Sequence, residues 1–512
     1  MGFTDLDKPC KTLGADNVNI SSPASSFGEI LTANIRPIGQ GDFVYGINNQ
    51  MFITSSFAGS TVEAVNGSCE LSSGTSASGS ATVQLRRGLK YRAGQGSLMK
   101  ATAVFDTPDA GNAQFIGAGT AECGYFVGYF GENFGVLHSI SGSREIRKLT
   151  ITTGAGTGDV TVTLNGNAVV VPVVGGSNPE QTAYQLSLGD YSQVGSGGWL
   201  ADAQGASVYF ISARSAETFT GTYSVAGASI VGSFTRTQEG QNQSNDFIAS
   251  SLFNVDRLDG NGPSGMTLDP QKGNIYQISF QYLGYGNARF SVECPSDGKL
   301  NLFHEIQNAN NRTDPVLKNP NVSVLATSAN IGGTTSKKLK TSSMGGFIEG
   351  QIITLDPKFA KSFTFSSVNS ATYKPLALFK VNRVFRDQSC FGEFDIIEVN
   401  GSNETAASSP KTITIALFLG AEITGEVDYQ YIDENNSVVS YAELDPGSGG
   451  DTITNLSDIT PFYEFVIGAG QGINIDITKL RYVFNINQPV LIAIKTSGAA
   501  SGKAGIIWFE QQ

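Results

Sequence analysis

Two histidines are the first candidates for chemistry in this 512-residue chain, because imidazole is a common metal ligand and general base. His304 is followed by Glu305, but no second histidine stands four residues after it, so the zinc-protease pattern is missing. His138 lies in an apolar, strand-like run, where a core histidine is the commoner explanation. Neither ring has an obvious serine or cysteine partner, so the sequence predicts no metal site and no catalytic nucleophile.

Three further segments could offer oxygen or backbone ligands. Gly498–Lys503 is one residue short of a phosphate loop, and Asp256–Gly262 lacks the closing glutamate of a calcium loop. Asp433 and Glu434 could serve glycoside hydrolysis, but that chemistry depends on a separation in space, and a turn explains the pair equally well. We therefore expect no cofactor, and we expect that the chain is not an enzyme.

Saccharides are the ligand class that the composition favours. Exposed tyrosine and tryptophan faces beside asparagine and aspartate suit polyols, and the chain has 17 tyrosines and two tryptophans. Trp508 lies in the apolar run 506–509, which favours a core position. Trp199, flanked by Gly197 and Gly198, is the one weak candidate for a ligand-binding residue.

Composition predicts an all-β protein, with 40% hydrophobic residues, 15% charged residues and 61 glycines for many turns. The net charge of −12 disfavours nucleic acid. Five widely spaced cysteines indicate neither a disulfide framework nor a zinc site. The first 11 residues do not resemble a secretory signal, and no run of about 18 apolar residues predicts membrane insertion.

We expect an N-terminal anchoring arm over residues 1–28, a first β-sandwich over 29–145 and 238–344, and a C-terminal β-sandwich over 345–512. These sandwiches are expected to be jelly-roll or lectin-like. Residues 308–343, which include the basic cluster 337–340, are predicted to be long solvated loops.

Residues 146–237 are predicted to form a small inserted module of ββαβ type. Asn165-Gly166 supplies a type I′ turn between two apolar strands, which predicts a hairpin. Asn178-Pro179-Glu180 provides an N-cap, a proline in the first turn and an early acid, so a short helix is expected to follow.

Several strings in the chain resemble a family of virion structural proteins found in large DNA viruses and tailed phages, mainly aquatic ones. The resemblance touches both ends of the chain and skips only the arm. It rests on the strings 87–96, 115–119, 269–278, 282–286, 489–494 and 507–511. What it implies is a fibre, spike or minor capsid component, β-sandwich in fold and commonly a homotrimer.

The leading hypothesis is therefore a structural component of a virus particle, located on the surface of the capsid or tail. The polar arm is expected to contact other virion proteins, the chain to associate with itself as a homotrimer, and the outward domains to meet host glycans. A cellular carbohydrate-binding lectin or adhesin is the alternative. A polysaccharide-cleaving enzyme ranks third, because it would need acidic residues converging in a groove.

Overall fold

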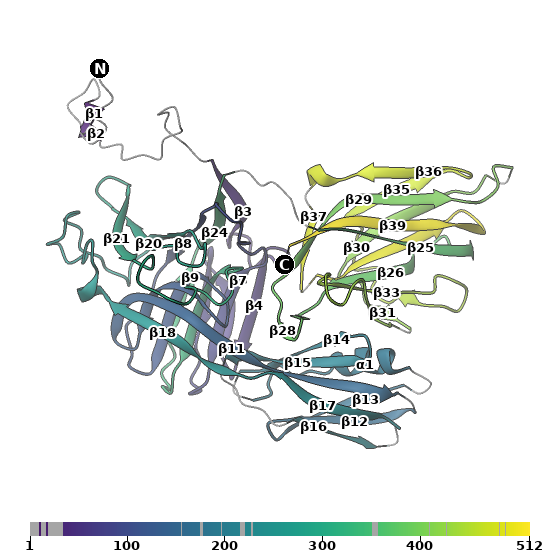
Figure 1. Ribbon diagram of the computed structural model, residues 1–512, viewed down its shortest axis with the longest axis horizontal. Coiled ribbons are helices and arrows are strands. Elements are labelled where there is room, and N and C mark those ends of the chain that lie inside the picture. Colours follow the sequence, from purple (N-terminus) through teal and green to yellow (C-terminus); the bar gives the residue numbers. More distant parts are fainter. Residues whose placement is uncertain are drawn as a thin grey trace.

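A computed structural model describes residues 34–512, apart from 155, 175–177, 196, 216–220, 227–228, 351–356, 409, 426, 481, 487 and 512, and two short strands within the first 33 residues, β1 (Cys10–Lys11) and β2 (Asn17–Val18). The predicted arm at 1–28 otherwise lies outside the described residues. The described chain is almost entirely antiparallel β-sheet, which confirms the predicted all-β class (Figure 1). No helix in these ranges is long and apolar enough to span a membrane.

The first sandwich packs two antiparallel sheets around the largest hydrophobic cluster of the described chain. The chain passes repeatedly from one sheet to the other, as in a jelly roll. One sheet has the order β21 (Leu300–Ile306), β20 (Ala288–Glu293), β19 (Asn274–Phe280), β8 (Ser97–Ala103), β24 (Ser343–Glu349) and β3 (Ile35–Asp42). The sheet opposite contains β4 (Phe52–Phe57), β7 (Ser80–Leu85), β22 (Ser323–Asn330), β9 (Asn112–Gly119), β10 (Gly124–Phe130), β11 (Asn133–Thr153) and β18 (Gln241–Ala249).

Strand β11 joins this sandwich to the inserted module. Its first half pairs with β10 and β18, and its second half with β15 (Ser207–Ser215) and β17 (Val231–Gln238) (Figure 1). Register shifts interrupt its pairing between Ser139 and Ile146, where the strand leaves one sheet and enters the other. The two bodies therefore share 21 residues of continuous strand.

The module has its own core of aliphatic and aromatic side chains. The predicted hairpin is confirmed as β12 (Gly158–Leu164) and β13 (Asn167–Val173), with φ of 49° at Asn165 and 79° at Gly166. The predicted helix is confirmed as α1 (Pro179–Ser187), whose Gln181 amide donates to the Asn178 side chain at 2.7 Å. The ββαβ expectation is too short, because β14 (Trp199–Gln204), β15, β16 (Gly221–Ala226) and β17 all follow the helix.

The C-terminal sandwich encloses a second large hydrophobic cluster, in which Trp508 is fully buried. Its five-stranded sheet holds β25 (Lys358–Val368), β39 (Ala500–Gln511), β29 (Glu393–Asn403), β36 (Gly472–Asp476) and β37 (Tyr482–Asn485). The facing sheet holds β32 (Gln430–Tyr431), β33 (Val439–Glu443), β26 (Lys374–Val381), β38 (Val490–Thr496), β30 (Ile413–Leu419) and β35 (Tyr463–Ile467). A small hairpin, β27 (Val384–Phe385) and β28 (Gln388–Ser389), projects from this sandwich toward the module (Figure 1).

The prediction of long loops over 308–343 is wrong. Residues 323–330 form β22, a central strand with neighbours on both sides, and Lys338–Thr341 form β23, which pairs with β6 (Ser68–Ser72) beside β5 (Thr61–Val65). Strand β22 lacks the alternation that marks a half-exposed strand, because Leu325 is buried on its outer face between Val324 and Ala326 on its inner face. Lys338 and Lys340 pair with Glu70 and are therefore not free in a loop.

Buried charges connect the three bodies. Lys380 of the C-terminal sandwich donates to Asp202 Oδ1 of the module at 2.5 Å, and both side chains are almost fully buried. Asp202 Oδ2 also accepts from the Arg383 amide at 2.9 Å. Arg214 of the module donates to Ser80 Oγ of the first sandwich at 2.7 Å. The seams between the bodies are thus closed by directional polar contacts, which fix relative orientation better than apolar contacts do.

We predict that Lys380→Met destabilises the protein by about 3–5 kcal/mol, because it removes the cation that donates to the buried Asp202 carboxylate. The double variant Asp202→Leu/Lys380→Met should lose less, since the carboxylate is then gone as well and only the attraction between Arg383 and Asp202 is lost. Denaturant unfolding of both variants measures the difference. If both variants lost the same free energy of unfolding, the cost would not come from a buried carboxylate that has lost its cation.

Candidate functional site

A groove of about 710 Å³ lies against the outer face of the sheet that contains β9 and β22. Its floor comes from β4, β7, β22, β9, β10 and β11, and one end is closed by residues 383, 391–393 and 485–486 of the C-terminal sandwich. The groove therefore depends on both the first sandwich and the way the C-terminal sandwich is seated against it.

The groove has an apolar floor because the central strands carry apolar residues on both faces of the sheet. In β9, Ile116 and Ala118 point into the main core, while Ala113 and Phe115 belong to a separate cluster on the outer face. Leu325 of β22 lies on the same outer face. Since alternate side chains point to opposite faces of a sheet, these strands supply a core and a groove floor together.

Two glycines give the floor its shape. Phe126 is opposite Gly117 in the β9–β10 register, and a Cβ at Gly117 would lie 2.6 Å from Phe126 Cδ1. A Cβ at Gly119 would lie 2.2 Å from Phe126 Cζ. Because neither glycine has a side chain, the Phe126 ring lies down over β9, and the missing side chains leave space above it.

Hydroxyl and amide groups surround this apolar floor. Thr82 and Thr327 form a hydrogen bond of 2.9 Å across β7 and β22, and Gln84 stands beside Leu325 in the same register. Gln243 and Asn245 of β18 line the other side. An aromatic floor with neutral donors and acceptors at its margins is the arrangement that favours polyhydroxylated ligands.

Charged groups gather at the closed end. Lys90 lies 3.7 Å from Glu393, which also accepts from the Gly88 amide at 3.1 Å. Arg144 lies 3.5 Å from Glu122, and Ser389 donates to the same carboxylate at 2.8 Å. Both carboxylates are therefore held by a cation and a second donor.

The groove lining is cationic overall. Four basic residues line it against one carboxylate, Glu393. One nitrogen of Arg86, Nη1, is buried and has no hydrogen-bond partner within the described part of the chain. Burial lowers the pKa of Arg86, although a guanidinium stays charged at neutral pH. In a protein of net charge −12, this end of the groove is a local concentration of basic side chains. The basic lining residues are Arg86, Lys90, Arg144 and Arg383.

Trp199, the candidate from the sequence, does not reach this groove. Its side chain is 2% exposed and packs in the core of the module, which leaves no ring face for a ligand. The expectation that it binds a ligand is therefore corrected by its burial. The sequence analysis did not identify the groove residues Phe115 and Phe126. Apolar residues at both odd and even positions of 112–119 and 124–130 could have indicated that these strands are buried on both faces.

The other candidate residues from the sequence do not come together in one site. Asp256 accepts from the Leu258 and Ser264 amides, and Asp433 accepts from the Asn435 amide, as side chains do in polar turns. Within the described ranges, no cluster of three histidine, cysteine, aspartate or glutamate side chains could hold a metal ion. Glu434 lines a second, smaller pocket away from the groove.

No protein-family model matches the chain, and no curated protein matches it. Solved structures similar to it include an endo-1,3-β-glucanase from Streptomyces sioyaensis, with 12% identity over 65% of this chain and 100% of that one, at a TM-score of 0.28. The exoplasmic/lumenal domain of VIP36, in a Ca²⁺/Man3GlcNAc-bound form, matches with 9% identity over 63% and 93% of the two chains at 0.24. A pseudo β-1,3-glucanase of Mycobacterium tuberculosis matches with 7% identity over 62% and 98% at 0.23.

The expectation that the chain is not an enzyme is contradicted by this set and is withdrawn. Glycoside hydrolases and a transglycosylase stand among the matched structures. Identities of 12% and below, with TM-scores of 0.28 and below, fix neither an activity nor a substrate.

The two histidines are buried core residues. His138 is 1% exposed, stacks on Tyr125 at 4.7 Å between ring centroids, and donates from Nε2 to the Val316 carbonyl at 2.7 Å. Its Nδ1 is buried without a hydrogen-bond partner among the described residues, so protonation would bury an unpaired N–H. Burial lowers the pKa of both His138 and His304 to about 4.

We predict that acid destabilises the protein through these rings. Each folded-state pKa lies below the unfolded value of 6.5, so the unfolded chain binds the extra proton and stability falls as the pH drops from 6.5 to about 4. The loss should approach about 3 kcal/mol per ring. His138→Gln, which keeps a donor for Val316, should remove its share, measured as the slope of unfolding free energy against pH. An unchanged slope would refute this origin.

Proposed function

We propose that this chain binds saccharides in the groove of its first sandwich, and that the preferred saccharides carry an acidic group. The observation that carries the proposal is the groove itself, with Phe126 laid over two glycines, hydroxyl and amide groups at its margins, and a basic end. A flat ring offers an apolar surface to the C–H face of a sugar, and amides and hydroxyls bond its hydroxyl groups.

The pairing of the floor strands supports a saccharide over an extended peptide. Peptides commonly join a sheet by adding a strand to a free edge. Strands β22, β9 and β10 are each paired on both sides, so the floor presents side chains and no free backbone edge. Recognition in this groove must therefore proceed through side chains, as it does for glycans.

The acidic preference follows from the charges at the closed end. Lys90 and Arg144 are balanced by Glu393 and Glu122, so the excess of positive charge in the lining comes from Arg86 and Arg383. The Nη1 of Arg86, which has no partner among the described residues, is proposed to donate to a carboxylate or sulfate group. The attraction between an acidic saccharide and these basic residues should weaken as ionic strength rises, because dissolved ions screen it. A neutral glycan should lack that salt dependence.

We further propose that the chain is a structural protein of a virus particle, which presents this groove to glycans of a host surface. The family-like strings in both sandwiches support this wider role. The arm is proposed to contact other virion proteins, and the chain to form a homotrimer.

Ala329→Trp is the variant that tests the groove. Ala329 is a half-buried lining residue on the outer face of β22, so a tryptophan there fills the groove without removing a hydrogen bond. Glycan-array screening followed by calorimetry should show binding of acidic oligosaccharides by the native chain and at least a tenfold loss in the variant. Val225→Trp places the same ring on the exposed face of β16 and should bind normally.

The same oligosaccharides are incubated with the native chain and analysed by chromatography for cleavage products. Cleavage that Ala329→Trp abolishes would support the groove as the saccharide site and make the protein a carbohydrate-active enzyme. Native binding that survives Ala329→Trp would overturn the groove proposal.

Self-association is tested by light scattering on the full chain. The proposal predicts a mass three times that of one chain. A monomer at every concentration would overturn the homotrimer and leave groove binding unaffected.

A further inference from the structure

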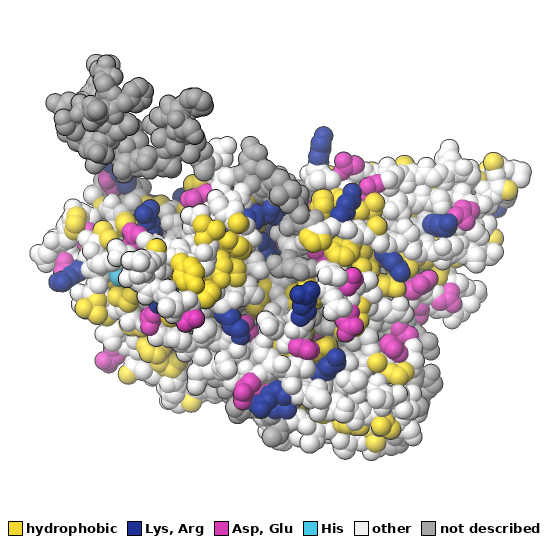
Figure 2. All heavy atoms as spheres, in the orientation of Figure 1, with side chains coloured by type: hydrophobic (Ala, Val, Ile, Leu, Met, Phe, Trp, Pro, Cys, Tyr) yellow, Lys and Arg dark blue, Asp and Glu magenta, His cyan; other side chains and the backbone are white. Residues whose placement is uncertain are grey.

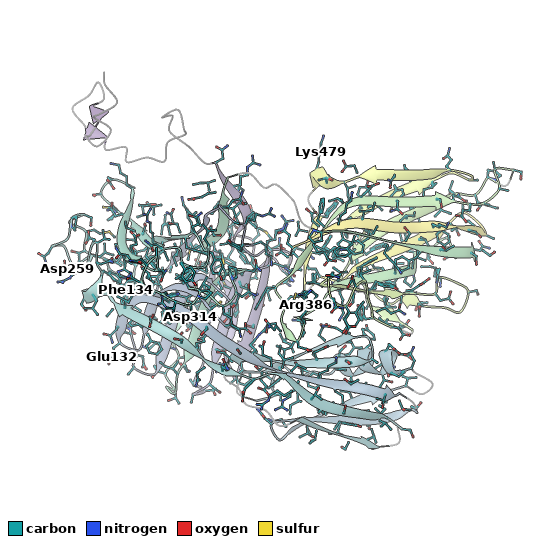
Figure 3. The ribbon with its side chains drawn as sticks, in the orientation of Figure 1. Glu132, Phe134, Asp259, Asp314, Arg386 and Lys479 are labelled. Carbon is teal, nitrogen blue, oxygen red and sulfur yellow. The ribbon has the colours of Figure 1, made fainter. Side chains whose placement is uncertain are left out.

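A second pocket, of about 260 Å³, lies at the seam between the module and the C-terminal sandwich. The module contributes Lys148, Gln204 and Tyr209, and the other wall comes from residues 382, 384–387, 431, 434 and 435. Figure 3 places Arg386 at this seam, and Figure 2 shows basic and acidic side chains close together there. Nearly every lining residue is polar or charged, in contrast to the groove.

The hairpin β27–β28 forms one wall under an unusual conformational constraint. Phe385 pairs with Gln388, so Arg386 and Asp387 are the two turn residues, with φ of 49° and 60°. Two-residue turns of this kind prefer asparagine, aspartate or glycine, and arginine is strained at positive φ. The Arg386 Nε donates to the Asn435 carbonyl at 3.0 Å, which holds this side chain against the pocket wall that contains Asn435.

A buried amide points to a ligand independently. Asn382 is 1% exposed and lines the pocket, and its Oδ1 has no hydrogen-bond partner among the described residues. Its neighbour Gln204 is fully engaged, since its amide donates to Asp202 and to the Val384 carbonyl and its oxygen accepts from Tyr431. The pocket therefore contains an acceptor that a bound donor group would satisfy.

The charges that line the pocket balance. Lys148 and Arg386 face Asp387 and Glu434, so two cations stand against two carboxylates. Burial, above all, raises the pKa of Tyr209 to about 12 and that of Tyr431 further, so both phenols keep their protons. The Tyr431 hydroxyl already donates to Gln204, so its oxygen is left to accept. A ligand that carries donors and acceptors but no net charge fits this lining best.

We propose that this pocket binds one neutral sugar ring, as a site separate from the groove. Its volume is below the roughly 300 Å³ at which pockets for drug-sized ligands begin, so it suits a single ring. Asn382 accepts a hydroxyl proton, the charged pairs bond the remaining hydroxyls, and the Tyr209 and Tyr431 rings offer apolar contact. Because one wall of the pocket belongs to the module and the other to the C-terminal sandwich, the bound sugar also joins these two parts.

The hairpin permits a variant that is expected to fold well. Arg386→Asn/Asp387→Gly installs the preferred turn residues and removes both charged side chains. The relief of turn strain opposes the loss of the hydrogen bonds from Arg386 to the Asn435 carbonyl, so the Tm without ligand should change by only a few degrees. The probes are free mannose, galactose, glucose and N-acetylglucosamine, followed by saturation-transfer NMR and calorimetry. We expect one of them to bind the native chain with a Kd of about 1 mM, as is usual for so few contacts, and the variant to lose at least tenfold.

Asn382→Ala is a second test, and it should weaken the binding of the monosaccharide at least fivefold. Ala329→Trp, which fills the groove, should leave monosaccharide binding unchanged, so failure here and failure of the groove proposal are distinguishable. No saturable binding of any probe, binding that survives both pocket variants, or inorganic phosphate binding in place of the sugars would each overturn the proposal.

Discussion

One continuous strand, β11, sets the arrangement of this molecule. At about 3.3 Å per residue its 21 residues extend for roughly 70 Å, and the two halves belong to different sheets. A module connected by loops would be free to turn about them, whereas a shared strand transmits orientation through its paired neighbours. The bulged segment from Ser139 to Ile146 bends the strand at the crossing, and Arg144 and Glu145 are buried at that bend. The position of the module, and hence of every seam, follows from this strand.

Buried charges then select one docking of the C-terminal sandwich among the many that apolar surfaces would permit. Lys380 with Asp202, Lys90 with Glu393, and Ser389 with Glu122 each require a particular approach, because an unpaired partner would remain desolvated. The same contacts create the sites. The Lys90–Glu393 pair closes the groove, and the contacts of Asp202 and Gln204 hold the wall on which the second pocket is built.

Sequence patterns were informative where the signal is local. Asn165-Gly166 and Asn178-Pro179 each specify a backbone conformation within a few residues, so the hairpin and helix α1 were predictable. Strand β22 was not, because the run Val324–Ala326 is apolar on both faces and removes the alternation by which a strand is recognised. The groove could not be predicted either, because it depends on the pairing of distant strands. Its floor is assembled from strands up to about 270 residues apart in sequence, and only the register brings Gln84, Leu325 and Phe126 into one row across the sheet.

Local rules fail in the structure at two instructive places. Gly117 and Gly119 interrupt a central strand, where glycine packs poorly and lowers stability, yet their positions allow Phe126 to lie over the sheet. Arg386 occupies a turn position that arginine does not favour, yet its side chain lines a pocket with an unsatisfied amide. Consistency between local preference and global fold is the norm in natural proteins, and departures concentrate where a site requires them. Backbone strain alone does not mark a site in this chain, because Ala58, Leu258 and Ser367 also have positive φ and line neither cavity. What distinguishes Gly119 and Arg386 is that each lines a cavity that also contains a buried polar atom without a partner among the described residues.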